Sequence, residues 1–379
     1  MDLTLNETQR ETRAAAHDYA RTLIDGVGAR EHAHAVDPAV IVGLGERGLL
    51  GVNLPTQLGG RGAGVVAYAL AVQEIAAVDP AVSVTMAVTN MVGEVITRFG
   101  SDAQRAAYVP MLTAGRCLGG AFALSEPGAG SDAASLRTRA ERDGDHWILN
   151  GEKLWITTGD EAGVVVIWAR TGGEGHRGIS CFLAPGDTPG LVAGKPEEKM
   201  GLRASHTVPV SLSDVRLPGD AMLSHEGEGF KIAMVALDGG RIGIGSQSVG
   251  MARAVLAESR ELLLQLDGPA AADIAAAHVA DMATELEAAA MLVLRAAWLK
   301  EQARPFSREA AMAKVFASES ANRMARRSLQ ILGQTRRMGD TPAVQRLTRL
   351  VRDARVAQIY EGTSEIQRLV IAREALRAS

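Results

Sequence analysis

The sequence predicts an α+β fold in which a middle antiparallel β domain separates an N-terminal helical domain from a C-terminal helical bundle. Apolar residues recur with helical spacing in the first and last thirds of the chain. Short runs rich in β-branched residues fill the stretch between them. We therefore expect an N-terminal helical domain over residues 1–117, a β domain over 118–225 and a helical bundle over 226–379.

The N-terminal helical pattern extends from Thr8 to about Arg116. It is interrupted at residues 26–28, at Pro38 and at a glycine cluster over residues 58–64. The cluster lacks the Gly-Lys-Ser/Thr ending of a phosphate-binding loop, and no β-branched run leads into it. We expect it to be a loop between helices.

In the middle domain, Gly, Asp and Pro separate β-rich runs at residues 146–149, 163–169, 179–183 and 208–212. Such short runs with turn residues between them predict strands of a small antiparallel sheet. In the last domain, long Ala, Leu, Met and Arg segments, including residues 273–304 and 308–332, predict packed helices.

Composition excludes several classes of protein. With 379 residues, 47% of them hydrophobic, the chain can bury a large core, and its net charge of −4 does not suggest a nucleic-acid partner. Cys117 and Cys181 lack Cys-x-x-Cys spacing, so neither a disulfide framework nor a zinc site is indicated. The sequence also lacks a secretory signal and a membrane span, and we expect a cytoplasmic location.

A carboxylate near the end of the chain is the most informative single residue. Glu361 is followed by Gly362, Thr363 and Ser364 and then by a helical pattern. Gly362 leaves space beside Glu361 for a substrate, and the hydroxyl residues can cap a helix or hold phosphate and ribose oxygens. This segment alone leaves two alternatives open, a general base and a solvent-exposed Glu beside a helix cap.

Residues 123–132, 153–159 and 359–368, in this order and at these separations, resemble the acyl-CoA dehydrogenase family. Residues 199–203, 237–241 and 330–333 match as well, so the resemblance covers nearly the whole chain. The resemblance implies FAD as cofactor. A flavin needs donors along its polar edge and an apolar wall against its ring, and the first two motifs contain residues of both kinds. The implied FAD contacts are Phe122, Leu124, Ser125, Gly130, Ser131, Trp155, Ile156, Thr157, Gln330, Leu332, Gly333, Thr363 and Glu365. Without the resemblance, Trp155 would be interpreted as a core aromatic residue.

The resemblance also implies a mechanism. Glu361 removes the α-proton of an acyl thioester while the β-hydrogen leaves as hydride to flavin N5. An apolar pocket should raise the pKa of Glu361 above its ordinary value of about 4.3. The backbone N–H of Glu361 and a ribityl hydroxyl of the flavin would then stabilise the developing enolate.

Gly240 places the chain within the family. In the isovaleryl and long-chain branches, the base resembles a Glu at this position, just before Arg241, so Glu361 is the only candidate here. Residues 237–247 look most like the short-chain, butyryl-type branch. The implied substrate contacts are Ser131, Asp238, Arg241, Tyr360 and Gly362. Asp238 and Arg241 can also be interpreted as a charged pair at the start of a helix.

Two segments depart from the family pattern. The usual Arg-x-x-Phe-Gly segment is missing from residues 261–270, and Gln334 stands where the family has a second glycine. Both changes fall on the inter-subunit end of FAD. We expect Arg336 or Arg337 to supply the missing positive charge, and Arg260 is a further candidate.

These observations favour an acyl-CoA dehydrogenase of fatty acid metabolism that passes electrons to an electron-transfer flavoprotein and forms a homodimer or homotetramer. One alternative enzyme acts on an acyl-carrier-protein thioester or uses oxygen as acceptor. A second alternative is a non-catalytic flavin-binding scaffold. We expect no metal site at His32 and His34, which cannot share a helix face. The arginines at 346, 349, 352 and 355 predict a helix stripe facing solvent or another subunit.

Overall fold

The computed structural model describes residues 4–263, 269–334 and 341–377. Its first part is helical, and side-chain caps define several helix starts. Asn6 and Ser101 form capping boxes, while Asp37 and Asp79 cap helices whose first residue is a proline. The glycine cluster is a loop between helices, as predicted. The helices are α1 (Glu7–Leu23), α2 (Val27–Ala33), α3 (Pro38–Glu46), α4 (Gly64–Ala76), α5 (Pro80–Phe99) and α6 (Asp102–Thr113).

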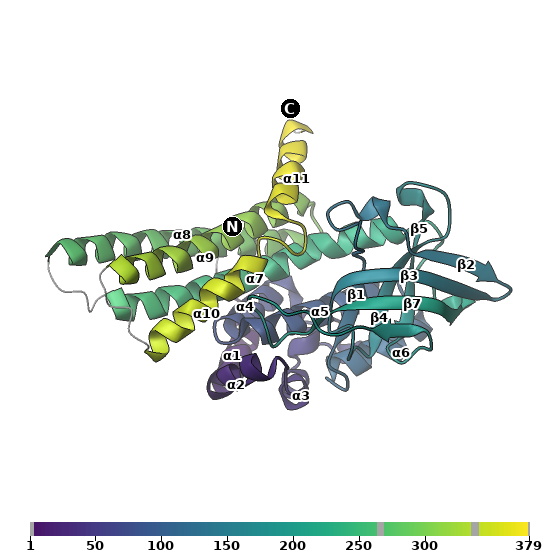
Figure 1. Ribbon diagram of the computed structural model, residues 1–379, viewed down its shortest axis with the longest axis horizontal. Helices are drawn as coiled ribbons and strands as arrows, with labels where there is room; N and C mark the ends of the chain where they lie inside the picture. The colour runs from purple at the N-terminus through teal and green to yellow at the C-terminus, as the bar shows by residue number, and fades with distance from the viewer. Residues whose placement is uncertain (1–3, 264–268, 335–340, 378–379) are drawn as a thin grey trace.

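The middle part forms a single sheet with strand order β1-β4-β2-β3-β7-β6, and β5 pairs with β4 (Figure 1). The predicted strands are present and most neighbours are antiparallel. However, β1 lies parallel to β4, with Gly120 opposite Val164. The β2–β3 hairpin comes between these two strands in the sequence, and its second strand brings the chain back to the end of the sheet where β1 began. The strands are β1 (Gly120–Ala123), β2 (Arg139–Asp143), β3 (His146–Thr157), β4 (Val164–Arg170), β5 (Ile179–Pro185), β6 (Leu191–Ala193) and β7 (Thr207–Pro218).

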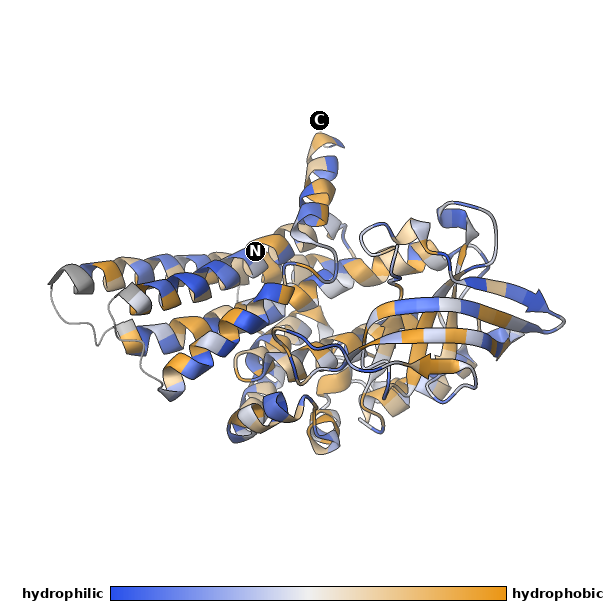
Figure 2. Ribbon diagram, viewed as in Figure 1, coloured by the Kyte–Doolittle hydropathy of each residue, from blue (hydrophilic) through white to orange (hydrophobic). Residues whose placement is uncertain are grey.

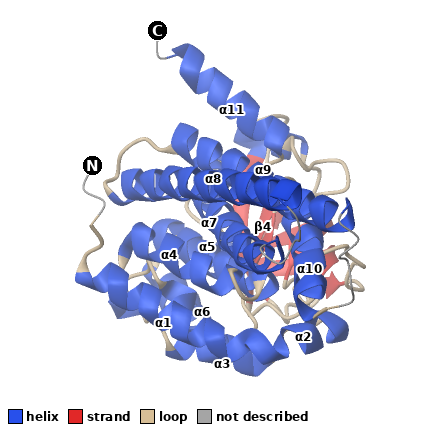
Figure 3. Ribbon diagram, turned by 90° about the vertical axis from the view of Figure 1, so that its left-hand side faces the viewer, coloured by secondary structure: helices blue, strands red, loops and turns tan. Residues whose placement is uncertain are grey.

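The last part returns to long helices, which confirms the helix, sheet, helix order. Helices α7, α8, α9 and α10 pack together on one side of the sheet, and α11 leaves the body of the molecule in both views (Figures 1 and 3). Helices α4 and α5 pack on α7. The helices are α7 (Gly229–Leu263), α8 (Pro269–Glu301), α9 (Ser307–Gln334), α10 (Pro342–Val356) and α11 (Ser364–Arg377).

A hydrophobic core joins the sheet to the helices. Met91 of α5, Phe122 of β1, Trp168 of β4 and Ile232 of α7 meet there, and Tyr360 packs against the same cluster. A separate core fills the other face of the sheet. The β2–β3 hairpin carries hydrophilic residues toward its tip, away from both cores (Figure 2). The junction core therefore brings the β domain and the C-terminal loop to one place.

Two arginines of the stripe on α10 form ion pairs with acidic residues of other helices. Arg346 pairs with Glu258 of α7 at 2.7 Å, and Arg352 pairs with Glu31 of α2 at 2.5 Å. Both side chains nevertheless stay open to solvent, with exposed fractions of 44% for Arg346 and 31% for Arg352, which agrees with the predicted solvent-facing stripe. Across the described ranges, no helix combines the length and apolar character required to cross a membrane.

Candidate active site

Glu361 stands in a strained loop between α10 and α11. Its backbone φ is 53° and that of Gly362 is 88°. Left-handed backbone is uncommon for a residue with a side chain and persists where the surroundings enforce it. Gln367 Nε2 donates to the carbonyls of Glu361 (3.0 Å) and Gly362 (2.9 Å), and Lys314 Nζ donates to the Gly362 carbonyl at 2.7 Å. Gln367 and Lys314 are fully buried, so they fix the loop from inside the protein.

The carboxylate of Glu361 lies against α7. Its Oε2 atom is buried and has no hydrogen-bond partner among the described residues. A Cβ added at Gly240 would stand 2.5 Å from this oxygen and 3.2 Å from the Sδ of Met91. The carboxylate of Glu361 can therefore occupy this position only because residue 240 has no side chain.

Burial raises the pKa of Glu361 to about 7, while the positive charges of Arg241 and Lys314 act to lower it. This confirms the predicted direction of the shift. Burial also lowers the pKa of Lys314 to about 8, against the attraction of Glu361. A carboxylate with a pKa near 7 is suited to accept a proton at neutral pH.

The backbone N–H of Glu361 donates no hydrogen bond to any residue in the described ranges. Its carbonyl, by contrast, accepts from Gln367. A backbone donor with no partner in the described ranges, next to a carboxylate, is a group that can stabilise negative charge on a carbonyl oxygen.

Asp238 and Arg241 lie inside α7 and not at its start, because this helix begins at Gly229. The alternative interpretation as a helix-start pair is therefore wrong. Arg241 donates to Asp238, and the Ser307 hydroxyl donates to the other oxygen of the same carboxylate. Arg241 is buried near Glu361, and its Nε has no partner among the described residues.

Tyr360, which was predicted to contact the substrate, uses its hydroxyl for a hydrogen bond within the protein. Its hydroxyl donates to Oε1 of Gln247, which is fully buried on α7. Gln247 Nε2 in turn donates to the Pro80 carbonyl at 2.8 Å. The hydroxyl of Tyr360 is thus engaged within the protein, which leaves its ring as the part that a substrate could touch.

The two predicted flavin motifs meet at the sheet. The Leu154 N–H donates to the Ser125 carbonyl at 2.9 Å and so joins them. Phe122 packs on Trp168, with ring centroids 4.2 Å apart. Leu124 is buried beside this pair. Together they supply a connected apolar wall.

Trp155 is 59% exposed, so the interpretation as a core aromatic residue is wrong. The pairing of β3 with β7 shifts register between Lys153 and Ile156, and Trp155 has a φ of 63° within this bulge. The bulge turns the indole outward, while Ile156 remains in the sheet core and Thr157 is half-buried.

The loop after Ser125 is open. Gly130 and Ser131 are exposed, and a Cβ at Gly130 would meet nothing within 4 Å. An exposed indole, an open glycine loop and the nearby apolar wall fit the flat ring and polar edge of a flavin.

Other predicted cofactor residues lie elsewhere. Thr363 caps α11 by accepting from the Ile366 N–H at 3.4 Å, and Glu365 is exposed. At the end of α9, Gln330 and Gly333 are exposed and Leu332 is buried. Within one chain, Gln330 lies about 24 Å along α9 from Lys314. Gln330, Leu332 and Gly333 therefore lie far from the loop of Glu361 in the same chain. Their contact with the FAD of another subunit stays a prediction.

The predicted cofactor clamp cannot be placed. Arg336 and Arg337 lie outside the described residues, as does most of the segment that replaces the missing Arg-x-x-Phe-Gly motif. Arg260 is exposed near the end of α7. The proposal that one of these arginines contacts the FAD diphosphate stays a prediction.

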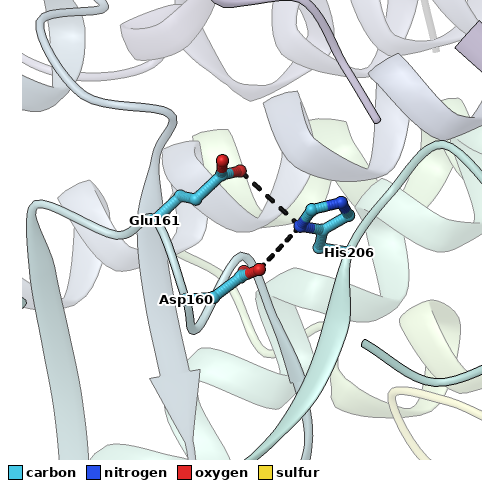
Figure 4. A group of neighbouring side chains, drawn as sticks. All are labelled: Asp160, Glu161 and His206. Carbon is cyan, nitrogen blue, oxygen red and sulfur yellow. Dashed lines mark hydrogen bonds and ion pairs between the residues drawn. The ribbon is translucent and has the colours of Figure 1, made fainter. Parts of the chain in front are cut away.

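One group of metal-ligand type occurs in the described ranges. Asp160 and Glu161 follow β3 and face His206, which directly precedes β7 (Figure 4). His206 Nδ1 lies 2.6 Å from Asp160 Oδ2 and 3.7 Å from Glu161 Oε2. Ion pairing accounts for this arrangement. His34, for its part, contacts the Arg203 guanidinium at 2.6 Å.

Two residues of the site were missed from the sequence: Lys314 and Gln367. Lys314 and Gln367 stand in helical patterns, where polar side chains ordinarily face water. The Ala-Lys-Val context of Lys314, on an otherwise apolar face, is the signal that could have identified a buried lysine.

Sequence profiles of three domains match almost the entire chain. They are the acyl-CoA dehydrogenase N-terminal domain over residues 6–116, the middle domain over 121–215 and the C-terminal domain over 227–376. The chain belongs to the acyl-CoA dehydrogenase family. It is an oxidoreductase of the short-chain, butyryl-type branch.

Close relatives agree with this assignment. The mitochondrial short-chain specific acyl-CoA dehydrogenase of Bos taurus is 42% identical over 386 residues, which covers 99% of this chain and 91% of the relative. The structure of butyryl-CoA dehydrogenase from Megasphaera elsdenii matches with a TM-score of 0.94 at 37% identity, over 100% of both chains.

Two further solved structures bear on ligands. A chain in the structure described as the electron transferring flavoprotein of Acidaminococcus fermentans is 38% identical, with a TM-score of 0.93 over 100% of both chains. Glutaryl-CoA dehydrogenase from Mycobacterium smegmatis in complex with FADH2 is 31% identical, with a TM-score of 0.89 over 99% of this chain and 96% of that one.

Proposed function

We propose that this acyl-CoA dehydrogenase oxidises the α,β carbon–carbon bond of a short-chain acyl-CoA, with Glu361 as the base that removes the α-proton. The observation that carries the proposal is the position of Glu361. Its Oε2 atom is buried and has no partner among the described residues, its pKa is raised by burial to about 7, and Lys314 and Gln367 fix its loop. FAD, when bound, supplies the hydride acceptor.

Neighbouring residues prepare Glu361 for this role. Lys314 and Arg241 supply positive charge that favours the carboxylate over the protonated acid. The N–H of Glu361, which donates to no described residue, is a donor for the thioester carbonyl and makes the α-proton more acidic. The empty position at Gly240 lets the carboxylate lie against α7 on the substrate side.

We further propose that Phe122, Leu124, Ser125, Trp155 and Thr157 hold the flavin ring. The Mycobacterium smegmatis relative with FADH2 supports FAD as the cofactor. The Acidaminococcus fermentans neighbour supports an electron-transfer flavoprotein as the partner that receives electrons. Assembly into a homodimer or homotetramer and a cytoplasmic role in fatty acid metabolism belong to the same proposal.

The test is anaerobic mixing of the purified FAD-loaded protein with acetyl-, butyryl-, hexanoyl- and octanoyl-CoA, followed by the visible absorbance of the flavin. We expect butyryl-CoA to bleach the flavin fastest, and acetyl-CoA, which has no β-carbon, to leave it oxidised. The same acyl groups on a carrier protein test the alternative substrate, and reoxidation by oxygen tests the alternative acceptor. Retention of the oxidised spectrum with every thioester would indicate the non-catalytic scaffold.

A further inference from the structure

A second polar group faces the same side of α7 as Glu361. Tyr68 of α4 is 6% exposed, and its hydroxyl points at α7, where a Cβ added to Gly243 would stand 2.6 Å from it. The same Cβ would stand 3.7 Å from that of Ala87 on α5. The Tyr68 hydroxyl makes no hydrogen bond to the part of the chain that the structure describes. The Tyr68 hydroxyl is not among the fully buried unpaired atoms, so it keeps some access and is available to pair with a ligand.

The position of Tyr68 limits the length of an acyl group. Gly240 and Gly243 are three residues apart on α7, so their Cβ positions would lie about 5–6 Å apart on one face. Glu361 covers the first of these glycines and Tyr68 covers the second. An acyl chain whose α-carbon lies at Glu361 and which follows α7 therefore meets the Tyr68 hydroxyl after a short distance.

The ring of Tyr68 packs in a hydrophobic core, whereas charged side chains lie along α7 on the side that its hydroxyl faces. Glu94 of α5 lies one helical turn away along α7, where a Cβ added to Gly239 would stand 3.8 Å from its Oε2 atom. Its carboxylate is held by Lys300 Nζ at 2.6 Å and by Asn53 Nδ2 at 3.1 Å. Asn53 Oδ1 is buried without a partner among the described residues. Burial and the charges of Glu94 and Glu361 raise the pKa of Tyr68, so the phenol stays protonated and can donate.

We propose that Tyr68 closes the acyl site and that its hydroxyl selects a short acyl-CoA with a hydroxyl group at the far end of the acyl chain. This inference rests on the proposed function. A substrate hydroxyl accepts from Tyr68 and donates to the acceptors beside it. A substrate carboxylate would be repelled by the negative charges of Glu94 and Glu361, which act on Tyr68.

The test compares butyryl-CoA with 4-hydroxybutyryl-CoA in the wild-type protein and in Tyr68→Phe. The ratio of their kcat/KM values is measured anaerobically with an artificial electron acceptor. Calorimetry with crotonyl-CoA and 4-hydroxycrotonyl-CoA gives binding constants without turnover. We expect Tyr68→Phe to lower both preferences for the hydroxylated ligand by about tenfold, because one hydrogen bond is lost while the shape is kept. A change of less than threefold in both ratios would overturn the assignment.

A second variant tests the length limit independently. Tyr68→Ala should admit hexanoyl-CoA, with a higher kcat/KM than the wild type, because the side chain that ends the site is removed. Tyr19→Phe is the matched control, since Tyr19 lies in the same hydrophobic core but its hydroxyl donates to the Val40 carbonyl, and the variant should leave both ratios unchanged. Flavin reduction by neither four-carbon substrate in wild-type protein would contradict the proposed function itself. Reduction by both substrates with ratios insensitive to Tyr68→Phe would contradict only the role of Tyr68.

Discussion

The carboxylate of Glu361 occupies the space that a side chain at Gly240 would need: a Cβ at residue 240 would stand 2.5 Å from the Oε2 atom of Glu361. This distance is too short for a side chain at residue 240 to coexist with the carboxylate in its present place. The resemblance placed the base of other branches at position 240, and the structure supplies a steric reason why the two placements exclude each other. The sequence of α7 is therefore matched to the loop that follows α10.

We predict that Gly240→Ala lowers the rate of flavin reduction by about 100-fold, because a displacement of about 1 Å at a reacting group has an effect of this size. FAD content should not change. Gly28→Ala is the control, since Gly28 is also helical and a Cβ there meets nothing within 4 Å. Rapid mixing with butyryl-CoA measures both variants. Equal rates in Gly240→Ala and Gly28→Ala would show that the contact does not matter.

The pH dependence of kcat/KM should report the protonation of Glu361. The base must be ionised, so the rate should rise with pH through a midpoint near 7 and be lost below it. Lys314 acts to lower the pKa of Glu361, so Lys314→Met should move the midpoint upward by about one pH unit. Lys314→Arg keeps the charge and should leave the midpoint near 7. A midpoint unmoved in Lys314→Met, with a uniformly lower rate, would mean that Lys314 only holds the loop.

Trp155→Ala should weaken the binding of FAD, whereas Trp168→Ala should lower the stability of the apoprotein. Trp155 is exposed, so its truncation should leave the melting temperature of the apoprotein unchanged and weaken the binding of FAD. Trp168 is fully buried and donates to the Gly229 carbonyl at 2.8 Å. Its truncation should destabilise the apoprotein by about 3–5 kcal/mol. Calorimetry and flavin fluorescence measure the two effects. Unchanged FAD affinity in Trp155→Ala would remove this residue from the flavin site.

Periodicity was sufficient to predict the order of helices and strands, because amphipathic helices and short β-branched runs differ in apolar spacing. It could not predict that β1 pairs parallel with β4, since pairing depends on the path of the β2–β3 hairpin. Nor could it predict that Trp155 points outward. Strand alternation fails at a bulge, where one extra residue changes the face of the sheet.

The site was predicted in part. Glu361 and the raised direction of its pKa followed from the motif and from the expected burial. The buried partners Lys314, Gln367 and Tyr68 did not, because a helical pattern does not say which polar residue turns inward. Such residues become visible only when α4, α7, α9 and the loop before α11 are brought together.

The central claim is that Glu361 is the base, and Glu361→Gln tests it most directly. The variant keeps the shape of the side chain and removes its capacity to accept the α-proton. The measurement is the rate of flavin bleaching after anaerobic mixing with butyryl-CoA, alongside FAD content and the binding of crotonyl-CoA. We predict a rate lower by at least about 10²–10⁴, with FAD and ligand binding retained. A rate within tenfold of the wild type would contradict the assignment of Glu361 as the base.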